Sequence, residues 1–314
     1  MAGAGADGGP ASAALDWRRL RFDRALHDTF LRHFDQITPE NELKLFALQP
    51  RQGEYDFDDA DAMVDWARGH GKRVRGHVLV YGNQLPYWLT SVIWTRDELL
   101  DVMKDHIQTV MKHFQGRITE WDVVNEAVVD YGNGWTPNLW YQVIGPDYVE
   151  KAFRFAHEAD PGARLVYNDN GIDLPDHPHT VRLRALLSDL LKRGVPINAV
   201  GMQNHMSNKY MANGFQVAET MRRFEALGLD VAVTEMDVRN DNGLAGATEL
   251  ETQRQTFEGA AWACRIEPRC LSFSTWGISD RYSWINPALT PLTFDANMNP
   301  KPAFYAVEDW IKKQ

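Results

Sequence analysis

The stretch WDVVNEA at residues 121–127 decides the fold. Val123 and Val124 are β-branched and apolar, as the residues of a buried strand usually are. Glu126 closes this run, and a carboxylate beside a buried strand costs free energy unless it has a partner or a chemical task. Two interpretations fit the pattern: a salt bridge at the strand end, or a catalytic acid at the carboxyl end of a barrel strand.

A second stretch of the same kind, VAVTEMDV at residues 231–238, runs from apolar strand residues into Glu235. Two carboxyl groups that flank a glycosidic bond can hydrolyse it, because one donates a proton while the other attacks carbon or activates water. The pair resembles the catalytic motifs of glycoside hydrolase family 10, the endo-β-1,4-xylanase family. The acid/base motif of that family ends in Asn-Glu. Its nucleophile motif reads Thr-Glu-Leu-Asp, where this chain has Met236 in place of leucine.

Composition excludes several other classes of protein. The chain has 314 residues, 44% of them hydrophobic and 24% charged, which suits one large soluble domain. A net charge of −10 argues against nucleic-acid binding and is compatible with a neutral sugar polymer. No apolar run reaches the about 18 residues of a membrane span, so we expect no membrane partner.

Strand-like and helix-like segments alternate eight times, which predicts a single-domain (β/α)8 TIM barrel over residues 11–314 after a disordered leader at 1–10. The expected strands lie at 11–15, within 33–44, at 73–82, 121–127, 165–168, 197–205 and 231–238, and at 271–277. The expected helices lie at 23–34, 57–70, 95–114, 147–159, 179–193, 215–227, 247–265 and 302–311. Thr95 and Glu98 form a capping box, and the long connection at 128–146 is expected to be functional.

The resemblance implies roles for residues that follow the predicted strands. Glu126 matches the general acid/base, Glu235 the nucleophile, and Asn125 the residue that holds the sugar 2-hydroxyl. His205 is expected to bond Glu235, and Asp237 to bond His205, a chain that orients the nucleophile and keeps it ionised. The implied substrate-binding residues are Glu40, Asn41, Lys44, His77, Tyr81, Gln84, Gln203, Trp276 and Trp284.

Plainer interpretations stay open for several of these residues. A lone histidine such as His77 is more often a satisfied core residue, and either tryptophan alone could be core. The segment from Glu40 to Lys44 could be an ordinary helix start. His205, Asp237 and Glu235 could hold a metal, but their spacing is not the compact spacing of a helical metal motif, so we expect neither metal nor cofactor.

The chain departs from the family pattern at two places. Tyr81-Gly82 stands where the family typically has Trp-His, beside the sugar that becomes covalently bound. The lost volume is expected to be filled by water or by another residue, and a wider pocket would tolerate glucosides better. Asn170-Gly171 replaces a frequent Tyr-Asn, so an aromatic platform on the leaving-group side is missing or supplied elsewhere.

Cys264 and Cys270 are the only cysteines and flank Pro268. Two unrelated thiols are one interpretation, but the family often carries a disulfide here, and we expect one. A disulfide implies an oxidising compartment. On that ground we expect a secreted protein. Residues 1–10 contain no apolar h-region, so we expect that the signal peptide is absent from this sequence.

Together these patterns predict a monomeric, secreted, retaining endo-1,4-β-xylanase that acts on xylan. One alternative is a retaining β-glycosidase of the same family that acts on another β-glycoside, such as an aryl or saponin glycoside or a cellobioside. Another is a non-catalytic carbohydrate-binding barrel, although binding proteins commonly lose a catalytic carboxylate and both are present here.

Overall fold

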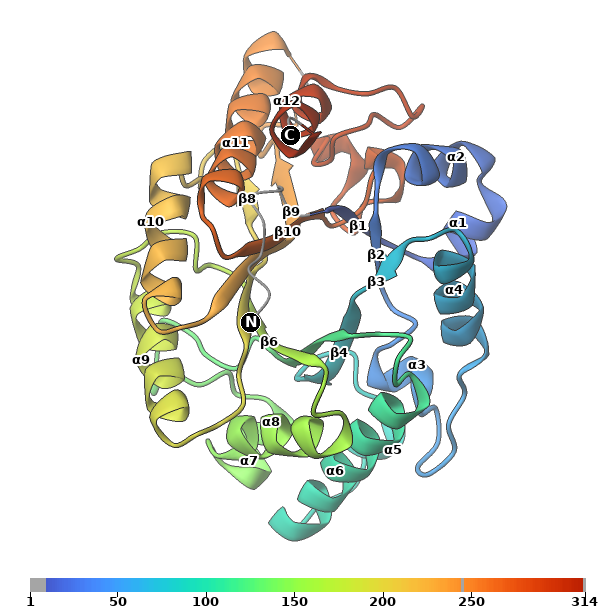
Figure 1. Ribbon diagram of the computed structural model, residues 1–314, viewed down its shortest axis with the longest axis vertical. Helices are drawn as coiled ribbons and strands as arrows, with labels where there is room; N and C mark the ends of the chain where they lie inside the picture. The colour runs from blue at the N-terminus through green and yellow to red at the C-terminus, as the bar shows by residue number, and fades with distance from the viewer. Residues whose placement is uncertain (1–9, 244–245, 313–314) are drawn as a thin grey trace.

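The computed structural model describes residues 10–243 and 246–312. Parallel strands form a nearly closed barrel at the centre, and helices surround it (Figure 1). The strand segments are β1 (Ala11–Leu15), β2 (Gln36–Pro39), β3 (Arg73–Val74), β4 (Gly76–Tyr81), β5 (Glu120–Asn125), β6 (Arg164–Asp169), β7 (Ala199–Met202), β8 (His205–Ser207), β9 (Asp230–Arg239) and β10 (Cys270–Thr275). The predicted single-domain barrel is therefore confirmed over the described residues.

Two of the expected strands are divided. The barrel path runs β3-β2-β1-β10-β9-β7-β6-β5-β4, so its two ends are segments of the strand expected at 73–82. That strand breaks at Arg75, whose buried guanidinium pairs with Asp122 of β5. The Arg75 backbone N–H still donates to the Ile37 carbonyl of β2 at 2.9 Å. Because Arg75 directly precedes β4, this bond links β2, beside one end of the path, to the start of β4 at the other end. The strand expected at 197–205 divides in the same way, and β8 pairs with β9.

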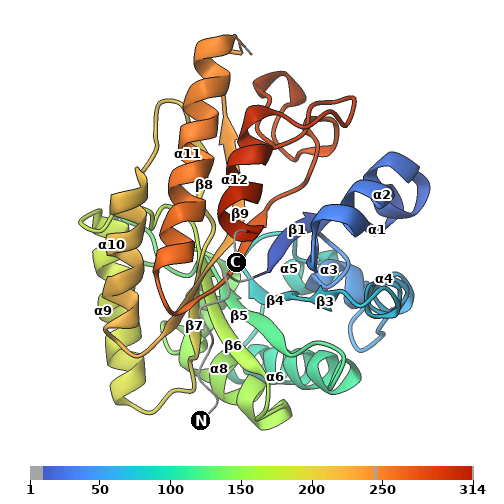
Figure 2. The same ribbon diagram turned by 45° about the horizontal axis from the view of Figure 1, so that its top comes forward.

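Eight helices lie where the sequence predicts them, within a few residues at each end. They are α2 (Arg24–His33), α4 (Asp58–Gly69), α6 (Arg96–His113), α8 (Tyr148–Ala159), α9 (Pro178–Lys192), α10 (Gly214–Glu225), α11 (Ala247–Ile266) and α12 (Pro302–Lys312). The capping box of Thr95 and Glu98 is present at the start of α6. Figure 2 shows α9, α10 and α11 side by side along one flank of the barrel.

Four further helices were not expected: α1 (Trp17–Phe22), α3 (Leu45–Leu48), α5 (Tyr87–Thr90) and α7 (Leu139–Ile144). Each has four to six residues, too few to show a helical period in the sequence. The structure also has two 3₁₀ turns, η1 (Asp280–Tyr282) and η2 (Pro287–Leu289). Three of the short helices, α3, α5 and α7, lie in the connections that follow β2, β4 and β5, where a barrel carries its site.

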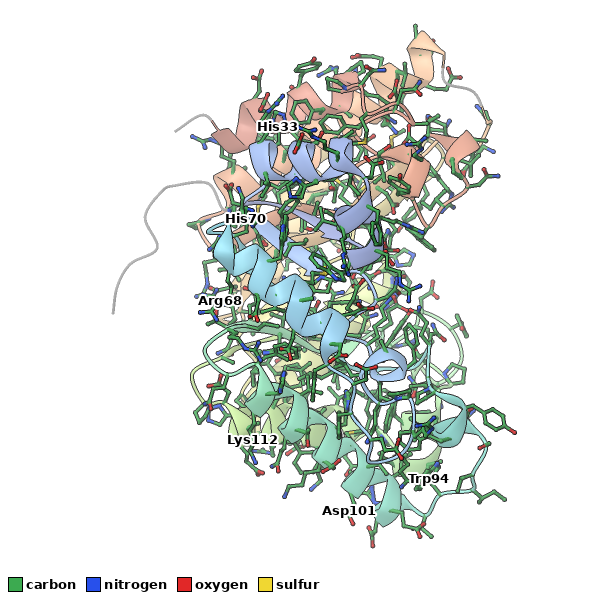
Figure 3. All side chains as sticks on the ribbon, turned by 90° about the vertical axis from the view of Figure 1, so that its right-hand side faces the viewer. His33, Arg68, His70, Trp94, Asp101 and Lys112 are labelled. Atoms are coloured by element: carbon green, nitrogen blue, oxygen red, sulfur yellow. A yellow bond between two sulfur atoms is a disulfide. The ribbon has the colours of Figure 1, made fainter. Side chains whose placement is uncertain are left out.

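The strands all run in one direction and each long helix runs back in the other, so every strand begins at one end of the barrel and finishes at the opposite end. Figure 3 shows the outer faces of α4 and α6, with Trp94 and Asp101 toward one end and His70 and Lys112 toward the other. Trp94 precedes α6 and marks the end at which the strands finish. At the start of β1, the Pro10 carbonyl accepts from the Phe273 N–H at 3.3 Å, so Pro10 joins the barrel rather than the expected leader. The rest of that leader, residues 1–9, lies outside the described residues.

Cys264 and Cys270 form the predicted disulfide. It joins the last turns of α11 to the first residue of β10, so it lies at the end of the barrel where the strands begin. No membrane-spanning candidate occurs in the described part of the chain, because no helix there is both long and apolar enough.

Replacing both cysteines with serine is expected to lower the free energy of unfolding by at most about 2–3 kcal/mol, because the closed loop is short. Denaturant unfolding of the double variant against the oxidised protein measures this change. Activity should not change, since the bond lies at the end where the strands begin. Two free thiols found by alkylation and intact mass, in protein made under oxidising conditions, would overturn the disulfide itself.

Candidate active site

A cleft of about 800 Å³ opens at the carboxyl ends of the strands. Thirteen of the fourteen residues that the sequence singled out for catalysis or substrate binding line it: Glu40, Asn41, Lys44, His77, Tyr81, Gln84, Asn125, Glu126, Gln203, His205, Glu235, Trp276 and Trp284. The exception is Asp237, which is fully buried and is connected to the cleft through His205 and Trp284. Residues far apart in the sequence therefore converge, as the strand-end rule for barrels predicts.

Glu126 directly follows β5 and adopts a left-handed backbone with φ of 55°. This conformation costs about 1–3 kcal/mol for a non-glycine residue and is typical of functional sites. The Glu126 N–H donates to the Asn168 carbonyl at 3.0 Å, and its own carbonyl accepts from the Thr136 hydroxyl at 2.7 Å. These bonds hold the strained turn that aims the carboxyl group into the cleft.

The carboxyl group of Glu126 has neutral partners. Oε1 accepts from Gln203 Nε2 at 3.0 Å, and Oε2 accepts from the Tyr81 hydroxyl at 3.2 Å. Among the described residues, no lysine, arginine or histidine forms an ion pair with it, so the salt-bridge interpretation of Glu126 is wrong. A carboxyl group held only by neutral donors can take up and release a proton without breaking an ion pair.

Glu235 is buried on β9 and belongs to a charged chain. Its Oε2 lies 3.2 Å from His205 Nε2, and His205 Nδ1 lies 2.9 Å from Asp237 Oδ2. Trp284 Nε1 donates to the same Asp237 oxygen at 2.8 Å, although the Trp284 side chain is otherwise largely exposed. The predicted chain from Glu235 through His205 to Asp237 is confirmed.

This chain sets the charge of the nucleophile candidate. Burial raises the pKa of Glu235, but the hydrogen bond from His205 and nearby positive charge outweigh burial and hold the pKa below its usual value. Burial likewise lowers the pKa of His205, but the carboxylates of Asp237 and Glu235 outweigh it and hold the pKa well above its usual value. Glu235 is therefore a carboxylate that accepts a hydrogen bond from an imidazolium.

Replacing His205 with asparagine is expected to move the acid limb of the kcat/KM profile to higher pH. The pKa of Glu235 is depressed with His205 in place, so removal of the imidazolium lets Glu235 take up its proton at higher pH. The pH profile on an aryl glycoside measures the shift. His179→Asn is the matched control, because His179 lines the same cleft but pairs with Asp169. An acid limb that stays in place in His205→Asn would contradict this role.

Three amide side chains connect the two glutamates. Gln203 Nε2 donates to Glu126 Oε1 and, at 3.1 Å, to Asn125 Oδ1. Asn168 Nδ2 donates to Asn125 Oδ1 at 2.8 Å and to Glu235 Oε1 at 2.6 Å. Because Asn125 Oδ1 accepts two bonds, its amide nitrogen is left as a donor for a hydroxyl in the cleft.

Asn168 is the functional residue that the sequence analysis missed. It is fully buried at the end of β6, paired in register with Asn125, and its Oδ1 accepts from the Thr234 hydroxyl at 2.7 Å. That bond fixes the amide so that Nδ2 faces Glu235. Its place at a strand end beside Asn125 was the available signal. The neighbouring Tyr167 is fully buried.

The segment after β2 lines one end of the cleft. Lys44 Nζ donates to Gln84 Oε1 at 2.7 Å and to Asn41 Oδ1 at 3.3 Å, and Gln84 Nε2 donates to the same Asn41 oxygen. Burial lowers the pKa of Lys44 and raises the pKa of Glu40 to about 7. Arg19 lies 3.7 Å from the Glu40 carboxylate. Lys44 is also the N-cap residue of α3, so the segment is a helix start whose polar side chains converge on the cleft.

His77 and Trp276 form a second wall. His77 Nδ1 lies 2.9 Å from Asp122 Oδ2, and Arg75 pairs with the other Asp122 oxygen at 2.5 Å. The rings of His77 and Trp276 meet nearly edge to face, 5.1 Å apart. The buried ion pair between Arg75 and Asp122 therefore fixes the position of the His77 ring, which borders the cleft.

The space that Gly82 leaves is occupied by a protein side chain. A Cβ on Gly82 would lie 2.6 Å from the Asn138 Cβ, so the Asn138 side chain packs directly against Gly82. Of the two expected fillers, water or another residue, the structure has the second. Tyr81 keeps a polar role, because Asn83 Nδ2 donates to its hydroxyl at 3.1 Å and the hydroxyl donates to Glu126.

The opposite end of the cleft was largely missed from the sequence. Besides Asn170 and Gly171, which the sequence analysis noted as a departure from the family pattern, the lining there consists of Asp130, His177, His179, Tyr210 and Arg239. Asn83, beside Tyr81, is a further lining residue that the sequence did not indicate. Most come from loops, where no strand pattern points to a cleft. Tyr210 lines this region and is about 39% exposed, so an aromatic ring is present near the Asn170-Gly171 departure.

Within the described ranges, no group of three or more His, Cys, Asp or Glu side chains is arranged to hold a metal ion. His205, Asp237 and Glu235 are instead bonded to one another in a line. The metal-site interpretation of these three residues therefore has no support in the geometry.

A parallel barrel with Glu126 and Glu235 at the carboxyl ends of two strands, both facing one cleft, has the arrangement of a glycoside hydrolase. The family model of glycosyl hydrolase family 10 matches residues 4–310. The chain belongs to that family.

Known relatives agree with this assignment. The chain is similar to endo-1,4-β-xylanase B of Thermotoga neapolitana, with 36% identity over 90% of this chain and 82% of the relative. The crystal structure of xylanase 10B from Thermotoga petrophila with xylobiose aligns with a TM-score of 0.92 and 36% identity, over 98% of this chain and 94% of the other. An intracellular xylanase of Thermoanaerobacterium saccharolyticum aligns with a TM-score of 0.89 and 35% identity, over 96% of this chain and 95% of the other.

Proposed function

We propose that this protein is a retaining endo-1,4-β-xylanase, with Glu126 as general acid/base and Glu235 as nucleophile. The observation that carries the proposal is the contrast between the two carboxyl groups. Glu235 is bonded to the His205 imidazolium, while Glu126 is bonded only to neutral donors. This contrast suits an ionised nucleophile and an acid that changes protonation state during the cycle.

The first step forms a covalent intermediate. Glu126 gives its proton to the oxygen of the leaving sugar as the glycosidic C–O bond breaks, and a Glu235 oxygen bonds to the anomeric carbon. The Asn125 amide donor is placed for the sugar 2-hydroxyl, a bond that strengthens in the transition state.

The second step releases the sugar. Glu126, now a carboxylate, takes a proton from water while the water oxygen attacks the anomeric carbon. The bond to Glu235 breaks, and both glutamates return to their starting protonation states. Two displacements at one carbon retain its configuration.

Hydrolysis of xylan, mixed-linkage glucan and aryl β-glycosides, with analysis of the products, tests the substrate. The proposal predicts that xylan yields short xylo-oligosaccharides from internal cleavage, and that the Glu235→Ala variant yields none. Cleavage of aryl glycosides alone would instead support the second candidate, a β-glycosidase for other substrates. Tyr81 in place of the family's tryptophan favours that candidate, because a smaller ring borders Glu126. Sugar binding with no cleavage of any substrate would support a binding protein.

We also propose that the protein is secreted and monomeric. The disulfide between Cys264 and Cys270 supports an oxidising compartment. One related xylanase is described as intracellular, so the compartment must be measured on this protein. Immunodetection in culture medium against cell lysate tests secretion, and light scattering tests the oligomeric state.

A further inference from the structure

Beyond Gln84 the cleft continues into a second hollow, the apolar trough. It has a volume of about 410 Å³ and is lined by Phe46, Pro50, Gln84, Leu85, Pro86 and Tyr87. Gln84 lines both the cleft and the trough, so the two hollows adjoin at this side chain. Gln84 is hydrogen-bonded to Lys44 and Asn41, which by resemblance to the family bind sugars on the non-reducing side of the cleaved bond. The trough therefore extends the cleft past the sugars that Gln84 and Lys44 reach.

Two exposed aromatic side chains border the trough. The Tyr87 side chain is 84% exposed and that of Phe46 is 37% exposed. Large aromatic side chains with this exposure contribute little to the core, and their faces can bury the apolar faces of sugar rings. A polysaccharide chain is a ligand with ring faces of that kind, spaced along its length.

The trough is held in shape by a contact between its two walls. Phe46 lies on α3, after β2, whereas Tyr87 begins α5, after β4. Trp88, the next residue of α5, donates from Nε1 to the Gln49 carbonyl at 2.8 Å, just before Pro50. This bond pins α5 to the segment that carries Phe46, so the platform is ordered before a ligand arrives. Preorganisation lowers the entropy cost of binding.

A competing path leaves the cleft at Asn41. It leads into a hollow with Phe46 on one side and Asp56, Asp58 and Asp59 on another. These carboxylates are hydrated charges, and a neutral xylose ring would gain little by displacing their water. Apolar ring faces therefore favour the trough beside Tyr87 over this acidic hollow.

We propose that Phe46 and Tyr87 form a distal binding platform for the non-reducing end of a long, neutral xylan chain. The inference rests on the proposed function, since it assigns a further part of the substrate to the same cleft. It predicts that the enzyme gains catalytic efficiency as the substrate grows past the sugars held by Lys44 and Gln84.

The test compares xylohexaose, labelled with ¹⁸O at its reducing end, with an aryl xylobioside. Tyr87→Ala should lower kcat/KM on xylohexaose about three- to tenfold and shift cleavage along the labelled chain, and it should leave the aryl xylobioside unaffected. Phe46→Ala should act in the same direction. Tyr87→Phe should behave as the parent enzyme, because the ring rather than the hydroxyl binds the sugar.

Two variants serve as controls. Tyr305→Ala removes another exposed tyrosine, from α12 and outside the cleft and trough, and should change kcat/KM on neither substrate. Asp59→Ala tests the acidic hollow. Loss on xylohexaose in Asp59→Ala with none in Tyr87→Ala would overturn the platform, as would equal losses on both substrates in Tyr87→Ala. Cleavage of neither substrate by the parent enzyme would instead contradict the proposed function.

Discussion

Replacing Glu235 with alanine is expected to abolish turnover of every substrate, with kcat falling on the order of 10⁶-fold, the scale seen when a covalent nucleophile is removed. Without the carboxylate no glycosyl–enzyme can form, whatever the leaving group. The loss should therefore be as severe for an activated aryl glycoside as for xylan. Steady-state assays on both substrates, with protein purified away from any host glycosidase, measure it.

The matched control for this change lies on the same strand. Asp230 begins β9 at the opposite end of the barrel from Glu235 and pairs there with Arg164 and Arg269. Partly exposed ion pairs contribute at most about 1 kcal/mol each, so Asp230→Asn should keep full activity. Retained hydrolysis in a folded Glu235→Ala protein would assign the nucleophile to another residue.

Replacing Glu126 with alanine should separate the two steps of the reaction. Hydrolysis of xylan should slow about 10²–10⁴-fold, the usual contribution of a general acid. Formation of the intermediate from an activated aryl glycoside should slow much less, because that leaving group needs no proton. The intermediate then accumulates, since the base for the second step is also missing, and pre-steady-state kinetics should show a burst of phenol.

Two additions sharpen this experiment. The isosteric Glu126→Gln variant keeps the volume and hydrogen-bonding positions near Gln203 and Tyr81, so a similar loss excludes a packing effect. Azide, an anion that needs no base, should restore turnover of the aryl glycoside and give a β-glycosyl azide. Equal pre-steady-state losses on xylan and on the aryl glycoside would contradict the acid/base role.

The sequence was most informative where chemistry follows a strand. The family resemblance named residues such as Asn125, Gln203 and Trp276, and because every strand of a parallel barrel ends at the same face, their positions predicted that they meet there. Both catalytic glutamates close apolar runs, but that pattern also fitted a salt bridge. The resemblance was needed to select the catalytic interpretation and to assign the two roles.

The sequence was least informative about contacts between side chains that belong to different strands or loops. Arg75, at the break between β3 and β4, forms a buried ion pair with Asp122, and no local pattern in the sequence reveals that contact. Asn138 fills the space beside Gly82 from a loop over fifty residues further along the chain. Backbone propensity carries no information about either contact, because both depend on tertiary packing.

The filling of that space changes the expectation for specificity. Gly82 no longer widens the pocket, and Gly82→His would collide with Asn138. Any broader tolerance of glucosides must then come from Tyr81, whose hydroxyl is already engaged with Glu126. Of the two substitutions expected to widen the pocket, only Tyr81 can still do so.

The most direct test of the account is to trap the covalent intermediate. Incubation with a 2-deoxy-2-fluoro-β-xylobioside bearing an activated leaving group slows both steps, but the leaving group still permits the first. Digestion and mass spectrometry then locate the adduct. The account predicts one xylobiosyl adduct, on Glu235. An adduct on Glu126 or on any other residue, or full hydrolysis without an adduct and with inverted product, would contradict it.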